Sequence, residues 1–123
     1  MSSADGLDEM STSGTTRVVE VDGGQVRAYD IAPEDVGLPR ADPGAITGGT
    51  PDVNAQTTRR IFAGEKGAAR DLAALNAGAA IYVSGRVSSL EEGVRTAEAA
   101  IDDGSAATAL DRLASLTREL SPA

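Results

Sequence analysis

Two adjacent carboxylates, Asp8 and Glu9, lie in a segment of glycine, serine and threonine near the start of the chain. Carboxylate oxygens are preferred ligands of Mg²⁺, and a site with one or two carboxylates leaves coordination positions for water and for substrate phosphates. Neighbouring acids in a loop are more often solvated turn residues, because loops run over the surface. Local pattern alone therefore favours a solvated loop, with a metal site as the alternative.

Two other segments could contact an anion. Gly48-Gly49 precedes a predicted helix start at Thr50-Pro51, and backbone N–H groups at a helix start favour negative charge. The spacing matches neither the P-loop nor the dinucleotide fingerprint, so a turn followed by a helix cap is favoured. Lys66 and Arg70 lie in the densest charged segment and could meet a phosphate or an acidic partner. We favour a helix-to-helix connection whose charges pair with each other or with water.

The composition excludes several kinds of site. The chain has no histidine and no cysteine, so disulfides, thiolate zinc sites and a histidine general base cannot occur. Its serines and threonines therefore lack the histidine that would activate a nucleophile. A formal net charge of -8 disfavours nucleic acid as a partner, because such binding depends on Lys and Arg. Without an apolar run near the ~20 residues of a membrane span, or a signal peptide, we expect a soluble cytoplasmic protein.

The segments around Asp8 and Glu9 predict a loop followed by a β-hairpin. Residues 1–14 are rich in Ser, Thr, Gly and acids and show no apolar periodicity, which is typical of a loop. Thr15 to Val21 and Gln25 to Ile31 are alternating or β-branched runs, separated by Asp22-Gly23-Gly24. Because glycine accepts a positive φ at no steric cost, this pattern predicts two antiparallel strands joined by a tight turn.

Proline and glycine limit the secondary structure that the middle of the chain can form. Residues 32–50 allow at most two short helical turns, one after Pro33 and one near Pro43. Thr50 followed by Pro51 combines a capping residue with proline at the first helical position. This pair predicts a helix over residues 51–63, which ends at Gly64.

The next two helices are expected to pack closely. A helix over residues 68–83 contains the small-residue string Asn76-Ala77-Gly78-Ala79-Ala80, which favours burial against a neighbouring element. Ser88-Ser89-Leu90-Glu91 fits a capping box for a third helix that ends before Gly104. The expected inward faces are Leu72, Leu75, Ala79 and Tyr82 on the second helix, and Leu90, Val94, Ala97 and Ile101 on the third.

A last helix is expected from Ser105, with Pro122 beyond its end. We expect it to form a helical hairpin with the third helix. Its inward face would then consist of Leu110, Leu113, Leu116 and Leu120. A hairpin followed by four helices is an unusual inventory for a complete domain, because a lone hairpin is marginally stable in water. The inventory indicates a fragment of a larger fold.

These segments together resemble a known family. Gly6-Leu7-Asp8-Glu9-Met10-Ser11 is similar to the Gly-Leu/Met-Asp-Glu-Leu/Met-Ser/Thr signature of anthranilate phosphoribosyltransferases. The resemblance continues in collinear order over nearly the whole chain. It includes the Gly37 to Arg40 connector, Gly48-Gly49 with Asn54-Ala55, Gly64-Glu65-Lys66-Gly67, Arg70-Asp71, Leu75-Asn76-Ala77, Ser89-Leu90-Glu91-Glu92-Gly93 and Ala100-Ile101-Asp102.

The resemblance implies an α/β fold: residues 1–123 would be the C-terminal segment of a phosphoribosyltransferase/nucleoside phosphorylase-like catalytic domain, a β-hairpin followed by about four α-helices. It implies transfer of phosphoribose from phosphoribosyl pyrophosphate to anthranilate, in tryptophan biosynthesis. Asp8 and Glu9 would bind Mg²⁺ that neutralises the departing pyrophosphate. Asp5 or Ser3 could assist without contacting the ion directly, although no motif supports this.

The chain departs from the family pattern in what it lacks. The family's N-terminal helical dimerisation domain, its Gly-Thr-Gly-Gly-Asp loop and its Lys-His-Gly-Asn residues are absent from these 123 residues. We therefore expect the isolated chain to be inactive, to expose apolar surface and to associate or be unstable alone. The complete enzyme would be a homodimer. Two alternatives stay open, an acidic helical scaffold without catalysis and a phosphoribosyltransferase of the same fold with another acceptor.

Overall fold

A two-residue turn at Gly23-Gly24 folds the first third of the chain into a β-hairpin. In the computed structural model, which describes residues 1–121, strand β2 (Thr16–Asp22) pairs antiparallel with β3 (Gln25–Ile31). Both turn glycines have positive φ, 54° and 83°, as a tight hairpin turn of this hand requires. The predicted hairpin is confirmed, with both strands within one residue of the expected ends.

The N-terminal segment is more ordered than a simple loop. Ser2 and Ser3 form a short strand, β1 (Ser2–Ser3), which pairs antiparallel with β2 and completes a three-stranded sheet in the order β1-β2-β3. The expectation of a loop over residues 1–14 was wrong for these two residues. Their polar side chains carry no strand signal, and the pairing depends on the neighbouring edge of β2.

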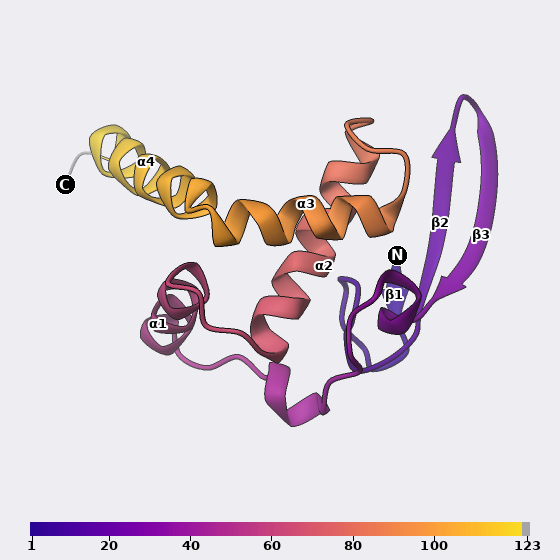
Figure 1. The fold of residues 1–123 in the computed structure, drawn as a ribbon, viewed down its shortest axis with the longest axis horizontal. Coiled ribbons are helices and arrows are strands. Elements are labelled where there is room, and N and C mark those ends of the chain that lie inside the picture. Colours follow the sequence, from indigo (N-terminus) through magenta and orange to yellow (C-terminus); the bar gives the residue numbers. More distant parts are fainter. Residues whose placement is uncertain (122–123) are drawn as a thin grey trace.

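The connector and the first three helices have the expected positions. Short 3₁₀ turns η1 (Pro33–Val36) and η2 (Pro43–Ile46) follow the sheet. Helices α1 (Pro51–Phe62), α2 (Ala68–Val83), α3 (Leu90–Asp102) and α4 (Ser105–Leu120) complete the chain (Figure 1). None of these helices is both long enough and apolar enough to cross a bilayer.

The N-cap of α3 lies one residue later than expected. Ser89 is the N-cap, and its hydroxyl accepts a hydrogen bond from the N–H of Glu92. The carboxylate of Glu92, rather than that of Glu91, accepts from the N–H and hydroxyl of Ser88. Two consecutive serines and two consecutive glutamates satisfy the motif in either register, so the pattern could not choose between them.

Helices α2 and α3 cross in close contact, which confirms the expectation for the small-residue string (Figure 1). A Cβ atom placed on Gly78 would lie 2.5 Å from the backbone nitrogen of Val94. A Cβ on Gly93 would lie 2.3 Å from the carbonyl oxygen of Gly78. Only glycine at both positions permits this approach, because any side chain would overlap the opposing backbone.

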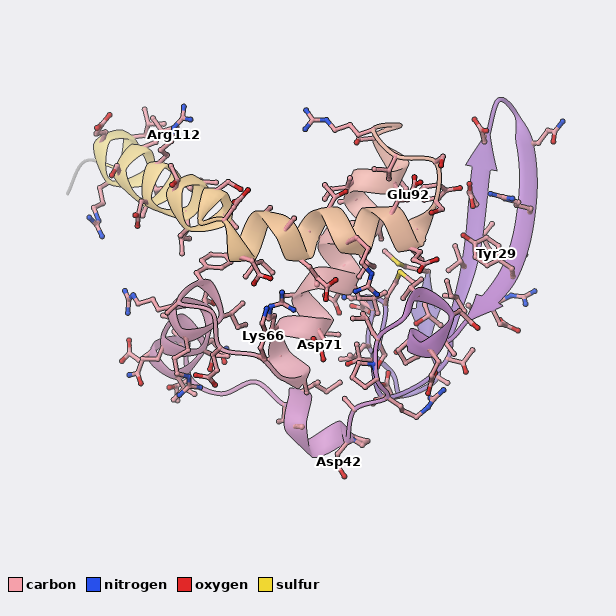
Figure 2. All side chains as sticks on the ribbon, viewed as in Figure 1. Tyr29, Asp42, Lys66, Asp71, Glu92 and Arg112 are labelled. Carbon is pink, nitrogen blue, oxygen red and sulfur yellow. The ribbon has the colours of Figure 1, made fainter. Side chains whose placement is uncertain are left out.

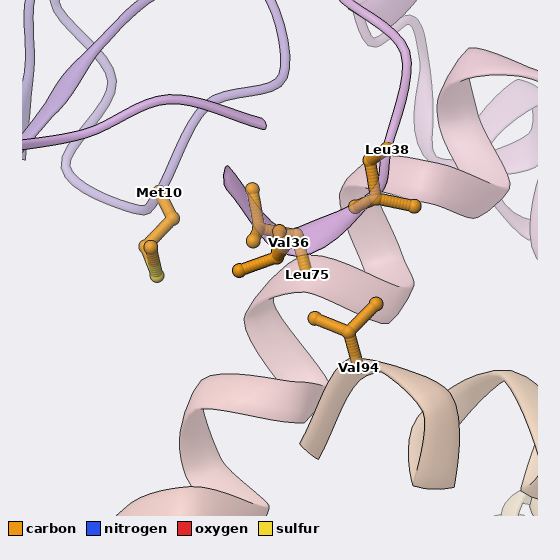
Figure 3. Packing of buried hydrophobic residues seen from close by; sticks show 5 residues of the cluster. All are labelled: Met10, Val36, Leu38, Leu75 and Val94. Carbon is orange, nitrogen blue, oxygen red and sulfur yellow. The ribbon is translucent and has the colours of Figure 1, made fainter. Parts of the chain in front are cut away.

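Two apolar clusters include residues of both crossing helices. The first joins the loop after β1, the connector and the two helices, through Met10, Val36, Leu38, Leu75 and Val94 (Figure 3). The second joins α1, α2 and α3, through Ile61, Ala74, Ala97 and Ile101. Three of the four residues expected inward on α3 are buried, while Leu90 is partly buried.

The last helix begins at Ser105 as expected, but the packing expected for it was wrong. Helix α4 does not fold back on α3 as a hairpin but extends away from its end (Figure 1). Leu113, Leu116 and Leu120 are 61%, 51% and 71% exposed, and only Leu110 is partly buried. A leucine stripe predicts an apolar face but not whether the same chain supplies its cover. Pro122 lies outside the described residues. Exposed Val19, Val21 and Val26 on the hairpin add to the apolar surface that we expected.

Candidate functional site

Asp8 and Glu9 lie in the loop between β1 and β2, and both residues are exposed. None of the ion pairs formed within residues 1–121 includes either carboxylate. Their oxygens therefore face solvent without a protein cation to neutralise them. This environment suits a ligand from solution, and the positions of the two residues depend on how the loop is held.

The upstream side of the loop is held by Asp5. Its carboxylate accepts hydrogen bonds from the hydroxyls of Ser11, Ser13 and Ser3, and from the N–H of Leu7 at 3.3 Å. These donors, Ser11 foremost, hold the pKa of Asp5 well below its usual range. The two residues that we named as assistants, Asp5 and Ser3, thus contact each other and fold the loop back on itself.

The downstream side of the loop is held by Asn76 on α2. Its side-chain oxygen accepts from the N–H of Met10 at 3.0 Å, and its NH₂ group donates to the carbonyl of Met10 at 2.9 Å. The side chain of Met10 is itself buried in the first apolar cluster. Sequence reasoning missed this role. The available signal was an asparagine in the middle of a helix, where its intrinsic propensity is poor.

The carboxylates of Asp8 and Glu9 fit a hard cation that receives the rest of its coordination shell from other ligands. Within residues 1–121, no group of three or more Asp, Glu, His or Cys side chains could hold an ion. Two carboxylates are too few for a complete protein cage, as a dedicated Ca²⁺ site would need. They match Mg²⁺, which is commonly held by one or two carboxylates, waters and substrate phosphates.

Lys66 and Arg70 are paired with acids, as favoured from the sequence. Lys66, beside the start of α2 (Figure 2), donates to Asp102 at 2.9 Å. Arg70 donates to Asp102 at 3.0 Å and to Glu98 at 3.3 Å, and its side chain is 5% exposed. The hydrogen bond from Lys66, followed by that from Arg70, lowers the pKa of Asp102. Arg70 joins α2 to α3, Lys66 joins the preceding connection to α3, and both cations are already neutralised.

The glycine pair before α1 is a turn with a cap, again as favoured. The hydroxyl of Thr50 accepts from the N–H of Val53 at 3.5 Å. Asn54 accepts from the N–H of Gly49 at 2.8 Å and donates to its carbonyl at 3.1 Å. A pocket of about 560 Å³ lies between this turn and the start of α2, and neither Asp8 nor Glu9 lines it.

Comparison with known proteins agrees with this architecture. The chain is 50% identical over 119 residues to the anthranilate phosphoribosyltransferase of Azorhizobium caulinodans, covering 97% of this chain and 35% of the relative. It is 49% identical over 117 residues to that of Rubrobacter xylanophilus, covering 94% and 34%. The crystal structure of anthranilate phosphoribosyltransferase from Thermus thermophilus superposes with a TM-score of 0.83 at 43% identity, covering 94% of this chain and 34% of that one.

The chain thus spans about a third of the length of these relatives. The comparisons confirm the resemblance drawn from the sequence, and the structural neighbour confirms the α/β fold class. The family model described as "Glycosyl transferase family, a/b domain" matches residues 1–107. Since this match includes most of the 123 residues, the chain belongs to the glycosyl transferase family.

Proposed function

We propose that this chain works as the C-terminal segment of an anthranilate phosphoribosyltransferase, which transfers phosphoribose from phosphoribosyl pyrophosphate to anthranilate in tryptophan biosynthesis. The observation that carries the proposal is the 50% identity over 119 residues with a relative of that name. A structural neighbour of the same name, at a TM-score of 0.83, supports it. This similarity favours an enzyme over an acidic helical scaffold.

In this proposal Asp8 and Glu9 bind Mg²⁺. Their exposure and their lack of ion-pair partners within residues 1–121 support the assignment. When bound, the ion supplies positive charge to the pyrophosphate that leaves. The chain's own contribution is to present two carboxylates side by side on a loop that is held at both ends, by Asp5 and by Asn76.

Residues that grip the substrates would come from outside these 123 residues, because the family's phosphate-binding and anthranilate-binding strings do not occur here. Phosphoribosyl pyrophosphate and anthranilate are the proposed partners of the complete enzyme. A homodimer formed through the N-terminal helical domain, a cytoplasmic location and inactivity of the isolated chain remain predictions.

A chimera tests both parts of the proposal. The chain would replace the matching segment of the Azorhizobium caulinodans relative, and anthranilate-dependent release of pyrophosphate would be measured over a range of Mg²⁺ concentrations. We expect the chimera to be active, and Asp8→Asn with Glu9→Gln to lower turnover and raise the Mg²⁺ requirement. Asp111→Asn with Glu119→Gln removes the same charge from the exposed surface of α4 and is the matched control.

A folded but inactive chimera would contradict the proposed function. An active chimera in which the Asp8 and Glu9 substitutions change neither turnover nor the Mg²⁺ requirement would contradict only the metal assignment. Turnover by the pure 123-residue chain would show that the substrate sites are not missing.

A further inference from the structure

The two carboxylates of the proposed metal site have positions that depend on their neighbours. Asp8 and Glu9 are exposed and join no ion pair within residues 1–121. Immediately after them, both backbone polar groups of Met10 are engaged by one side chain, that of Asn76. The N–H of Met10 donates to this amide at 3.0 Å, and its carbonyl accepts from it at 2.9 Å. Asn76 thus pairs with Met10 as a second peptide group would.

Asn76 is well placed to hold the loop because it stands on a rigid part of the fold. Its NH₂ group also donates to the carbonyl of Leu72 at 3.0 Å, which fixes the orientation of the amide on its own helix. The preceding residue, Leu75, is 1% exposed, and Gly78 lies against the backbone of α3. A side chain fixed by its own helix and by a packed crossing can impose its geometry on a loop.

Two roles for this amide make different predictions. Asn76 could serve only to satisfy the polar groups of Met10, whose side chain is 2% exposed. Alternatively, it fixes the direction in which the chain leaves Glu9, and so the arrangement of the two carboxylates. Both roles predict a loss of stability on substitution. Only the second predicts a loss of cation affinity beyond that of a comparable substitution elsewhere.

We propose that Asn76 is a positioning residue for the cation site at Asp8 and Glu9, acting through the backbone of Met10. This inference rests on the proposed function, specifically on the Mg²⁺ site. The fold supplies a matched control, since Asn54 on α1 makes the same pair of hydrogen bonds to the backbone of Gly49, which is flanked by Gly48 and Thr50 rather than by acids.

The test measures binding of Mn²⁺, as a paramagnetic substitute for Mg²⁺, to the chimera described under Proposed function in the presence of pyrophosphate, by water-proton relaxation with Mg²⁺ as competitor. Variants are compared only where their far-UV circular dichroism matches that of the unsubstituted chimera. We expect Asn76→Ala to weaken Mn²⁺ binding about 10-fold, the lower end for groups that orient metal ligands. Asn54→Ala should leave the dissociation constant within about 2-fold. If Asn76→Ala does not fold, Asn76→Gln displaces the amide by one methylene and takes its place.

The outcomes distinguish the role of Asn76 from the proposed Mg²⁺ site on which it rests. Binding that requires Asp8 and Glu9, yet is equally strong in the Asn76 and Asn54 variants, would overturn the role of Asn76 and leave the metal site standing. Binding that persists in Asp8→Asn with Glu9→Gln, or no binding by the unsubstituted chimera, would overturn both. Weakening confined to the Asn76 variant supports the positioning role.

Discussion

Replacing Gly78 by alanine would insert one methyl group into the crossing of α2 and α3. The new Cβ would lie 2.5 Å from the nitrogen and 2.7 Å from the Cα of Val94. Ordinary contact begins at 3.4 Å, so the helices would have to separate by about 0.9 Å. Such overpacking costs roughly 1–3 kcal/mol, and the upper end applies because backbone atoms cannot rotate away. Alanine regains about 1 kcal/mol of helix propensity. We therefore expect a net loss of about 2 kcal/mol in the free energy of unfolding.

Urea unfolding followed by circular dichroism measures this loss as a lower midpoint with an unchanged slope. Ala77→Gly, at the exposed neighbouring position, calibrates the propensity term and should cost about 1 kcal/mol. If Gly78→Ala instead raised stability by about the amount that Ala77→Gly lowers it, the close crossing would be refuted.

Three further predictions concern stability. Arg70→Met should cost about 2–3 kcal/mol in urea unfolding, because it removes a buried cation that pairs with Asp71, Glu98 and Asp102. Lys66→Met, at an exposed pair, should cost less than about 1 kcal/mol, and equal losses would contradict this. Hydrogen bonds from Arg27 and then Tyr82 lower the pKa of Glu20. The ionised Glu20 carboxylate therefore stabilises the folded chain fully above the unfolded pKa of about 4.3, and this stabilisation is lost as pH falls through the lower folded pKa. Glu20→Gln should then flatten the fall in unfolding free energy below about pH 5. The same fall in the variant as in the unsubstituted chain would count against this. Leu116→Ala, at a 51% exposed position, should lower the free energy of unfolding by less than about 0.5 kcal/mol, while Leu75→Ala should lower it by about 2–5 kcal/mol. Thermal unfolding compares the two variants, and a large loss of stability in Leu116→Ala would show that α4 is covered.

Much of the local structure could be predicted because its signals are short-range. Gly23-Gly24 set the turn of the hairpin, and the register of β2 and β3 follows from it. Thr50-Pro51 marked the start of α1, where the cap is observed. The N-cap of α3 was displaced by one residue because its serines and glutamates are doubled. The loop that carries Asp8 and Glu9 was expected as such, although the strand formed by Ser2–Ser3 was not.

The candidate site shows where short-range signals end. The resemblance identified Asp8 and Glu9 as the chemically interesting pair, but their support comes from residues distant in sequence. Asn76 lies 66 positions beyond Met10, and no local pattern connects the two. A mid-helix asparagine indicates some contact without naming the partner.

The sequence by itself determined the hairpin and the helix limits, because each depends on side chains within a few positions of one another. It also determined the family resemblance, and through it the pair of acids, because the order of motifs along the chain can be compared without a structure. Only the tertiary structure decided three other features. It placed Asn76 against the loop of Asp8 and Glu9, buried Arg70 between α2 and α3, and left the leucine face of α4 without a cover within residues 1–121. Such features depend on which surfaces meet, and that is set by the packing of the whole chain, here by two glycines that let α2 and α3 touch.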